Sequence, residues 1–392
     1  MRTVGVVTVA RSDFGIYLPI LKRIRESGDL QLRLIVSGMH LSPEFGLTYR
    51  YIEEQGFTID HRVEMLLSSD TPESIGKSTG LGVIGFAQLY AQHRPDILFV
   101  LGDRFEMLSA VLAAVPFAIP IAHLHGGEST EGLIDECIRH SITKMSHLHF
   151  ASTEGYATRI IQMGEEPWRV TVSGAPSLDN ILAMRLCGEA ELSESLRIPM
   201  SPKPILVTYH PVTLELQDTD LQFEQLLRAL KEIRRTTLFT YPNSDTNGRR
   251  IIAAIDDFVR HNPFAHVVPN LGTEMYFSVM KHAGVMVGNS SSGIIEAASF
   301  GLPVVNVGNR QQGRMRPANV IDVEDDSRVI SAAVQRALSP EFQRLAASNL
   351  NPYGDGNAAG RIVAVLEKAE LNRQLLVKKF YRLPRGQECV SS

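Results

Sequence analysis

Short apolar runs alternate with helix-period segments along most of this chain, and this alternation restricts the fold more than any other feature. The first series of strand-like runs lies at 3–9, 32–36, 97–101, 119–123, 149–151 and 170–172. A second series follows at 204–209, 237–241, 266–268, 284–287 and 303–307. Buried strands that alternate with amphipathic helices predict parallel sheets covered by helices on both faces. We therefore expect an α/β fold class with two doubly wound domains.

The length of the chain also favours two domains. At 392 residues it exceeds the size at which one hydrophobic core usually stops growing. The segment 179–204 is a candidate linker, and 358–379 is predicted to form one or two helices. Because a terminal helix in such proteins often returns to the first domain, we expect an N-terminal domain of 1–178 plus 365–392 and a C-terminal domain of 179–364. The carboxyl ends of both sheets would then face a central cleft.

The composition is that of an ordinary globular protein, with 44% hydrophobic and 21% charged residues and a net charge of −4. This slightly acidic balance argues against a nucleic-acid partner, which would require a basic face. No apolar run approaches the roughly 20 residues of a membrane span, and no signal-peptide pattern precedes the first strand. The three cysteines lack the spacing of a metal site. We expect a cytoplasmic protein with no membrane contact.

The stretch 286–301 carries the strongest functional signal. An apolar run ends in the small polar residues 289–292, which are expected to form a tight turn and then open a helix. Backbone N–H groups and hydroxyls at a helix N-terminus attract phosphate, because the helix dipole is positive there. Glu296 lies about two helical turns further on. This pattern predicts a nucleotide site.

Ionisable residues follow two strands of the first series. Arg11 and Asp13 stand at the position of a phosphate loop but lack its glycine pattern. They suit an anionic or hydroxyl-rich ligand, and the alternative is that Ser12 or Asp13 caps the following helix. Asp103 is a candidate acid or base at the end of a later strand, and the alternative is a capping aspartate with Arg104 as its surface partner.

A third strand of this series ends in a cluster of imidazoles and carboxylates. It contains His123, His125 and Glu128, and Asp135 and Arg139 follow on a predicted helix. A carboxylate in such a place can have its pKa raised enough to take a proton from carbon. The alternative for Asp135, Glu136 and Arg139 is surface salt bridging at i,i+3 and i,i+4 within about one helical turn. Because His-x-His lacks a third ligand at standard spacing, we expect no metal.

The second series carries fewer ionisable candidates. His210 ends its first strand, where an imidazole can donate to a phosphate or shuttle a proton, and a core histidine is the alternative. Asn243 follows the next strand. Tyr276, near Leu271, is a candidate to flank a nucleobase, although an aromatic residue on a helix face more often belongs to the core.

Taken together, these segments resemble the hydrolysing UDP-N-acetylglucosamine 2-epimerases of bacterial sialic acid biosynthesis. The resemblance covers nearly the whole chain and is carried by Arg11-Ser12-Asp13-Phe14, Ser37-Gly38-Met39-His40, Gly102-Asp103-Arg104, His125-Gly126-Gly127-Glu128, Ile138–Lys144, His210-Pro211, Gly288–Gly293 and Arg310–Arg314. It implies two Rossmann-like domains of the glycosyltransferase-B type. The N-terminal domain would hold the sugar and the catalytic groups, and the C-terminal domain would bind UDP.

The resemblance also implies residue roles. It implies Asp103 and Asp135 as catalytic carboxylates, and the positions of Glu128, His125 and His210 make them further catalytic candidates. Around UDP it implies Arg11, His210, Leu271, Tyr276, Ser290, Ser291, Glu296 and Arg310, and Asp13, Arg139 and Asn243 are further candidates for binding the substrate by their positions. Many relatives carry glutamate where this chain has His125. That departure leaves the identity of the C2 base open between Glu128 and an imidazole–aspartate pair.

The implied reaction is elimination followed by hydration. A base removes the C2 proton as UDP leaves C1, water then adds, and N-acetylmannosamine and UDP are released. No cofactor is expected, and the protein is expected to be a homodimer or homotetramer. The alternatives are a UDP-2,4-diacetamido-2,4,6-trideoxy sugar as substrate, a non-hydrolysing UDP-N-acetylglucosamine 2-epimerase, a UDP-sugar glycosyltransferase, or a catalytically silent UDP-sugar-binding regulator.

Overall fold

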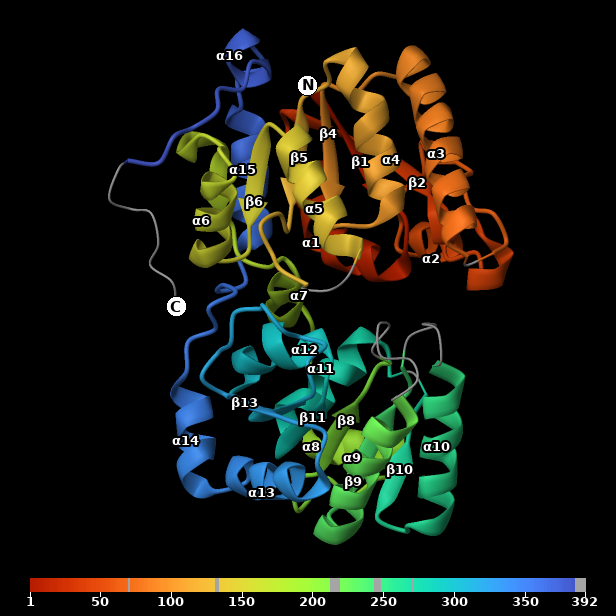
Figure 1. The fold of residues 1–392 in the computed structure, drawn as a ribbon, viewed down its shortest axis with the longest axis vertical. Helices are drawn as coiled ribbons and strands as arrows, with labels where there is room; N and C mark the ends of the chain where they lie inside the picture. The colour runs from red at the N-terminus through yellow and green to blue at the C-terminus, as the bar shows by residue number, and fades with distance from the viewer. Residues whose placement is uncertain (70, 131–133, 212–218, 243–247, 270, 385–392) are drawn as a thin grey trace. The chain divides into compact units, whose positions relative to one another are not determined.

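The computed structural model describes all residues except 70, 131–133, 212–218, 243–247, 270 and 385–392. The chain divides into two compact units (Figure 1). The first unit consists of Met1–Ser129, Leu133–Asn180 and Tyr353–Ser392. The second consists of Thr130–Gly132 and Ile181–Pro352. The expectation of a doubly wound α/β fold class is confirmed in each unit, as the two sheets show.

The first unit contains a seven-stranded parallel sheet in the order β3-β2-β1-β4-β5-β6-β7. Its strands are β1 (Arg2–Thr8), β2 (Leu30–Ser37), β3 (His61–Val63), β4 (Ile97–Leu101), β5 (Ile121–Leu124), β6 (Leu148–Ala151) and β7 (Val170–Val172). The central strands are runs of aliphatic residues that are buried on both faces, as parallel strands between two helical layers require. The strand order reverses at β1, so that helices cover both faces.

The helices of the first unit form two layers. They are α1 (Arg11–Glu26), α2 (Tyr49–Glu54), α3 (Pro72–Gln92), α4 (Phe105–Ala114), α5 (Ile134–Met145), α6 (Glu154–Gln162), α15 (Ala358–Lys368) and α16 (Arg373–Leu376), and α7 (Ser177–Ala183) crosses to the second unit. Figure 1 shows α3, α4 and α5 on one face of the sheet and α1 with α15 on the other.

The second unit repeats this architecture with a six-stranded parallel sheet in the order β10-β9-β8-β11-β12-β13. Its strands are β8 (Ile205–Thr208), β9 (Thr237–Thr240), β10 (Ala265–Val267), β11 (Val285–Gly288), β12 (Val304–Val307) and β13 (Val320–Val323). Its helices are α8 (Glu189–Leu196), α9 (Thr219–Ile233), α10 (Gly248–His261), α11 (Gly272–His282), α12 (Ser291–Ile295), α13 (Ser327–Ala337) and α14 (Pro340–Ser348).

The chain returns to the first unit before α15. The carboxylate of Asp179 accepts hydrogen bonds from the backbone N–H groups of Ala358 and Ala359 at 3.0 and 2.9 Å. These are unpaired donors at the start of a helix, so Asp179 fixes where α15 begins. All of α15 therefore belongs to the first unit, whereas the sequence pattern places the return at residue 365. The sequence does not reveal this earlier return, because Asp179, which binds the N-terminus of α15, lies far from α15 in the sequence.

Candidate active site

Parallel pairing brings the carboxyl ends of three central strands to one edge of the first sheet. Leu124, the last residue of β5, pairs with Leu101 of β4 and Phe150 of β6. Side chains that follow these strands can therefore meet although they are far apart in the sequence. Within the described part of the chain, no group of three or more His, Cys, Asp or Glu side chains is arranged to hold a metal ion.

Arg139 on α5 is the ionic centre of this edge. Its side chain is 2% exposed, and Nη2 donates to the Asp103 carboxylate. Nη1 donates to Oε2 of Glu136 at 2.7 Å and to the carbonyl of Glu128 at 3.0 Å. The ion pair between Arg139 and Glu136 is the i,i+3 contact expected from surface salt bridging. The guanidinium of Arg139 is buried, however, so this is not a surface pair. Arg139 thus orders the carboxylates of this edge, and a role in binding substrate stays a prediction.

Asp135 stands one turn before Arg139, near the start of α5. Burial raises the pKa of the Asp135 carboxyl, and the nearby Asp103 raises it further. A carboxyl group with a raised pKa remains protonated to higher pH and can act as a proton donor. The two carboxyl groups thus differ in their surroundings. Asp103 is paired with a buried arginine, whereas the surroundings of Asp135 disfavour its anionic form.

Arg104 does not pair with Asp103, so the predicted surface pair is wrong. Its Nε and Nη2 donate to the two carboxylate oxygens of Glu106 at 3.1 and 2.9 Å, and Glu106 is buried. Arg104 itself occupies the N-cap position of α4 and makes no side-chain capping hydrogen bond. The expectation that Asp103 caps α4 is therefore also wrong. The carboxylate of Asp103 pairs with Arg139 instead.

His125 and Glu128 form a hydrogen-bonded pair in the turn after β5. The His125 Nδ1 and the Glu128 Oε1 are 2.5 Å apart. The same Oε1 accepts a hydrogen bond from Ser152 Oγ at 2.9 Å, where the chain leaves β6. Gly127 has a φ of +75°, and a Cβ there would lie 2.4 Å from the carbonyl oxygen of Tyr156. Only glycine therefore fits at this point of the turn.

His123 lies directly behind this turn and is fully buried. Its Nε2 donates to the carbonyl of Gly102 at 2.8 Å, and its Nδ1 lies 3.2 Å from the Thr143 hydroxyl. Burial lowers the pKa of His123 to about 3. The imidazole is therefore neutral at physiological pH, and its contact with Gly102 holds the backbone immediately before Asp103.

Asp13 is buried and serves the turn before α1. Its carboxylate accepts hydrogen bonds from the Thr8 hydroxyl and from the backbone N–H groups of Val9 and Ala10, at 2.8 to 2.9 Å. These contacts support the capping alternative, and they keep the carboxylate away from solvent. Arg11 is exposed, and its guanidinium lies over the ring of Tyr51, 4.9 Å from the ring centroid.

In the second unit, the serine-rich segment forms a tight turn between β11 and α12. Gly288 has a φ of +136°, and a Cβ there would lie 2.1 Å from the carbonyl oxygen of Thr208 on the paired strand β8. Ser290 is the N-cap of α12, and its hydroxyl accepts from the N–H of Ser292 at 3.4 Å. Ser291 opens α12, which ends at Ile295. The predicted strand–turn–helix is present, with a helix of only five residues.

Asn289 ties this turn to the end of β8. Its Oδ1 accepts from the His210 N–H at 2.7 Å, and its Nδ2 donates to the His210 carbonyl at 2.8 Å. Its own carbonyl accepts from Arg310 Nη1 at 3.1 Å and from Gln311 Nε2 at 2.8 Å. Arg310, His210 and the serine turn therefore form one hydrogen-bonded group.

The other predicted residues of the second unit lie around β8 and α11. The Tyr276 hydroxyl is 3.3 Å from that of Thr208, and Leu271 precedes α11. Burial raises the pKa of Tyr276. Glu296 is buried at the end of α12. Asn243 lies outside the described residues.

His210 is buried, and its burial together with Arg310 lowers its pKa to about 3. Like His123, it is neutral in the folded protein between pH 6.5 and about 3, whereas an unfolded histidine binds a proton below about pH 6.5. The unfolded state therefore holds more protons in this window, and the protein should lose stability as pH falls through it. A His210 that acts as a cation toward phosphate is not supported.

This titration can be measured by chemical denaturation. Between pH 7.5 and pH 5, each of the two histidines should lower the free energy of unfolding by about 1–2 kcal/mol. The variant His123→Gln keeps a donor for Gly102 but cannot titrate, so the pH dependence of the first unit should become shallower. An unchanged pH dependence would remove His123 as its source.

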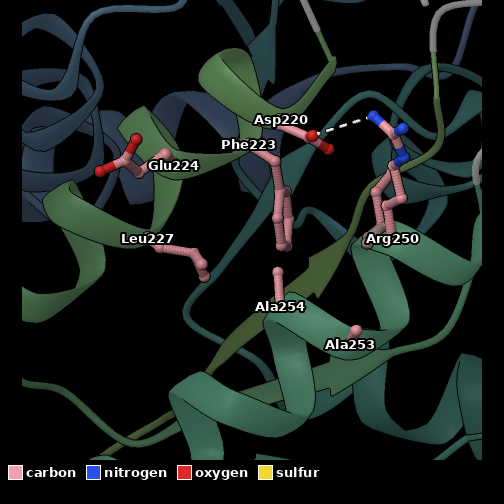
Figure 2. Close-up of a pocket in the computed structure, with 8 residues that line it drawn as sticks. Asp220, Phe223, Glu224, Leu227, Arg250, Ala253 and Ala254 are labelled. Atoms are coloured by element: carbon pink, nitrogen blue, oxygen red, sulfur yellow. Dashed lines mark hydrogen bonds and ion pairs between the residues drawn. The ribbon is translucent and has the colours of Figure 1, made fainter.

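A cavity of about 430 Å³ in the second unit does not belong to this group of residues. Figure 2 shows it between α9 and α10, with an ion pair of 3.1 Å between Asp220 and Arg250 at its edge. The residues that line it are Asp220, Phe223, Glu224, Leu227, Arg250, Ile251, Ala253 and Ala254. None of them is among the predicted site residues.

Sequence reasoning missed several residues that hold the predicted ones in place. They are Ser152, Asn289 and Gln311. A signal was present for two of them, because Ser152 follows a strand of the same sheet and Asn289 lies within the serine-rich turn. For Gln311 the sequence gives only its proximity to Arg310.

Two doubly wound sheets joined in this way define the glycosyltransferase-B fold class. A solved structure of UDP-N-acetylglucosamine 2-epimerase from Neisseria meningitidis, bound to UDP-N-acetylglucosamine, superposes with a TM-score of 0.77 at 20% identity. The superposition covers 94% of this chain and 100% of that one. The family model described as UDP-N-acetylglucosamine 2-epimerase matches residues 22–367. The chain therefore belongs to the UDP-N-acetylglucosamine 2-epimerase family.

Three relatives cover most of the chain. A GDP/UDP-N,N′-diacetylbacillosamine 2-epimerase (hydrolyzing) of Campylobacter jejuni is 39% identical and covers 88% of this chain and 89% of its own. A UDP-N,N′-diacetylbacillosamine 2-epimerase (hydrolyzing) of Legionella pneumophila is 36% identical, over 96% and 99%. The polysialic acid biosynthesis protein P7 of Escherichia coli is 34% identical over the full length of both chains.

Proposed function

We propose that this protein is a hydrolysing 2-epimerase that converts a UDP-2,4-diacetamido-2,4,6-trideoxyhexose and water into UDP and the free sugar inverted at C2. The observation that carries this substrate is the naming of two relatives, the Campylobacter protein for GDP/UDP-N,N′-diacetylbacillosamine and the Legionella protein for UDP-N,N′-diacetylbacillosamine, a nucleotide sugar of this class. Both are more than 35% identical to this chain over most of its length.

Each unit, taken by itself, contains groups of a kind that such a reaction needs. The C2 proton of a sugar is a very weak acid, so the departure of UDP must be assisted by fixed cationic and dipolar groups. Arg310 with the hydroxyls of Ser290 and Ser291 supports this role in the second unit. The cluster around Asp103 and Asp135 supports proton transfer at C2 in the first unit.

A second candidate is the same reaction on UDP-N-acetylglucosamine, which releases N-acetylmannosamine as the first step of sialic acid synthesis. It is favoured by the relative P7, which is named for polysialic acid biosynthesis and is 34% identical over the whole chain. The two substrates differ only at C4 and C6, so the same C2 chemistry serves both.

The test is a parallel reaction with the two UDP-sugars in D2O. We expect free sugar with deuterium at C2, equimolar UDP, and a kcat/KM at least about tenfold higher for the diacetamido substrate, since lost contacts at C4 and C6 are worth about 1–3 kcal/mol. Mass spectrometry and NMR identify the products. Free sugar without C2 exchange, or a UDP-linked epimer as the final product, would exclude a hydrolysing epimerase. The reverse preference would select UDP-N-acetylglucosamine.

A further inference from the structure

His125 is held in a backbone conformation that few side chains adopt. Its φ is +64°, in the left-handed region, where a residue with a Cβ is disfavoured by about 1–2 kcal/mol. The conformation is fixed from both sides, because the His125 N–H donates to the carbonyl of Phe150 at 3.0 Å and glycines follow it. Strain of this kind persists where the surrounding structure imposes it, often at functional sites. Here it fixes the position of an imidazole.

The neighbours of His125 also determine its tautomer. An ionised carboxylate can only accept hydrogen bonds, and Oε1 of Glu128 lies 2.5 Å from Nδ1. The Ser152 hydroxyl donates to the same oxygen from the other side, at 2.9 Å. With its proton on Nδ1, the imidazole presents the lone pair of Nε2.

Nε2 is the unsatisfied atom of this arrangement. The His125 side chain is 11% exposed, and its Nε2 is buried without a hydrogen-bond partner among the residues that the structure describes. Buried polar atoms are nearly always paired, so each exception needs an explanation. A basic nitrogen with a fixed orientation and no protein partner is suited to receive a proton from a bound molecule.

We infer that His125 is the base that removes the C2 proton, and that Glu128 and Ser152 are positioning residues that orient its imidazole. This inference rests on the proposed function and adds to it the identity of the base. In the step, the C2–H bond breaks and the proton goes to Nε2. Its electron pair forms the C1=C2 double bond, and the C1–O bond breaks with its pair leaving on UDP. Hydration then puts the hydroxyl of water on C1 and a proton on C2.

The other carboxylates of this edge are less suited to be the base. Oε1 of Glu128 already accepts two hydrogen bonds, and the side chain is only 5% exposed. Asp103 is paired with the buried Arg139. Asp135 is disfavoured as an anion by its burial and by Asp103. It is therefore better placed to donate the proton that C2 receives in the second step.

The test replaces His125 with glycine and adds free imidazole. Glycine adopts a positive φ without strain, so this variant should fold and leave room for the added base. Turnover should fall by about 10³-fold and recover at least about tenfold with imidazole, which a structural role would not produce. The variant His261→Gly, at an exposed histidine of α10, is the control and should show neither effect. UDP binding by calorimetry should stay within about twofold, because most of its predicted ligands lie in the second unit and His125 is not among them.

The positioning residues are tested separately. Ser152→Ala should lower kcat about tenfold with KM unchanged, and added imidazole should not restore it, because the histidine still occupies its place. Normal turnover of His125→Gly, or a loss that imidazole does not restore in a variant that binds UDP, would overturn the assignment. If His125→Gly fails to fold, His125→Asn, which also tolerates a positive φ, replaces it. C2 deuteration by the unmodified protein tests the proposed function independently.

Discussion

Replacing Asp135 with asparagine is expected to lower turnover by about 10²- to 10⁴-fold, because asparagine cannot donate the proton that C2 must receive. The carboxyl of Asp135 has its pKa raised by burial and by Asp103, which is the direction expected of a carboxyl group that donates a proton. The measurement is the rate of UDP release under saturating UDP-sugar. Affinity for UDP should change by no more than about twofold, because most of its predicted ligands lie in the second unit and Asp135 is not among them.

A matched variant separates this loss from a general effect of removing a carboxylate. Asp257 on α10 is exposed, so Asp257→Asn should keep full turnover. Near-normal rates for Asp135→Asn would remove Asp135 from the mechanism. A loss accompanied by a collapse of UDP affinity would instead point to a binding role.

The fold could be predicted because the dominant signal is local. Buried aliphatic runs between amphipathic segments indicate parallel sheets, and both sheets follow this pattern. The sequence pattern missed the edge strands β3 (His61–Val63) and β13 (Val320–Val323), which are short and partly exposed. An edge strand has one neighbour and less apolar burial, so its hydrophobic signal is weak.

The sequence marks candidate residues for the site but not how they pair. The ends of buried strands mark Asp103 and His125 as candidates, because ligands in such folds bind at the carboxyl ends of strands. That Arg139 is buried between Asp103 and Glu136 depends on how α5 packs, which no local pattern encodes. The same limit applies to Ser152, which reaches Glu128 only because β6 pairs with β5.

Asp13 is a residue for which the sequence left two roles open. A strand-end carboxylate favours a ligand as much as a helix cap at the level of sequence, and the structure supports the cap, with three donors on a buried carboxylate. The sequence alone could not decide, because both roles use the same residue at the same position.

Replacing Arg139 with methionine is expected to lower the free energy of unfolding of the first unit by about 1–3 kcal/mol, because the half-buried carboxylates of Asp103 and Glu136 lose their counter-charge and the carbonyl of Glu128 loses a hydrogen-bond donor. Methionine has a similar length and no strong steric demand, so the loss reports charge rather than volume. The measurement is denaturant unfolding followed by a probe in the first unit. Turnover should also fall, since Asp103 and Glu136 lose the group that orders them.

The control is Arg228→Met on α9, where the same residue type pairs with Glu224 at 2.7 Å on an exposed face. An exposed pair is worth about 0–1 kcal/mol, so this variant should be nearly as stable as the unmodified protein. The contrast tests whether burial, rather than ion pairing itself, makes Arg139 indispensable. If both variants lose less than about 1 kcal/mol, the Asp103–Arg139–Glu136 group is solvated, and the ordering role assigned to Arg139 fails.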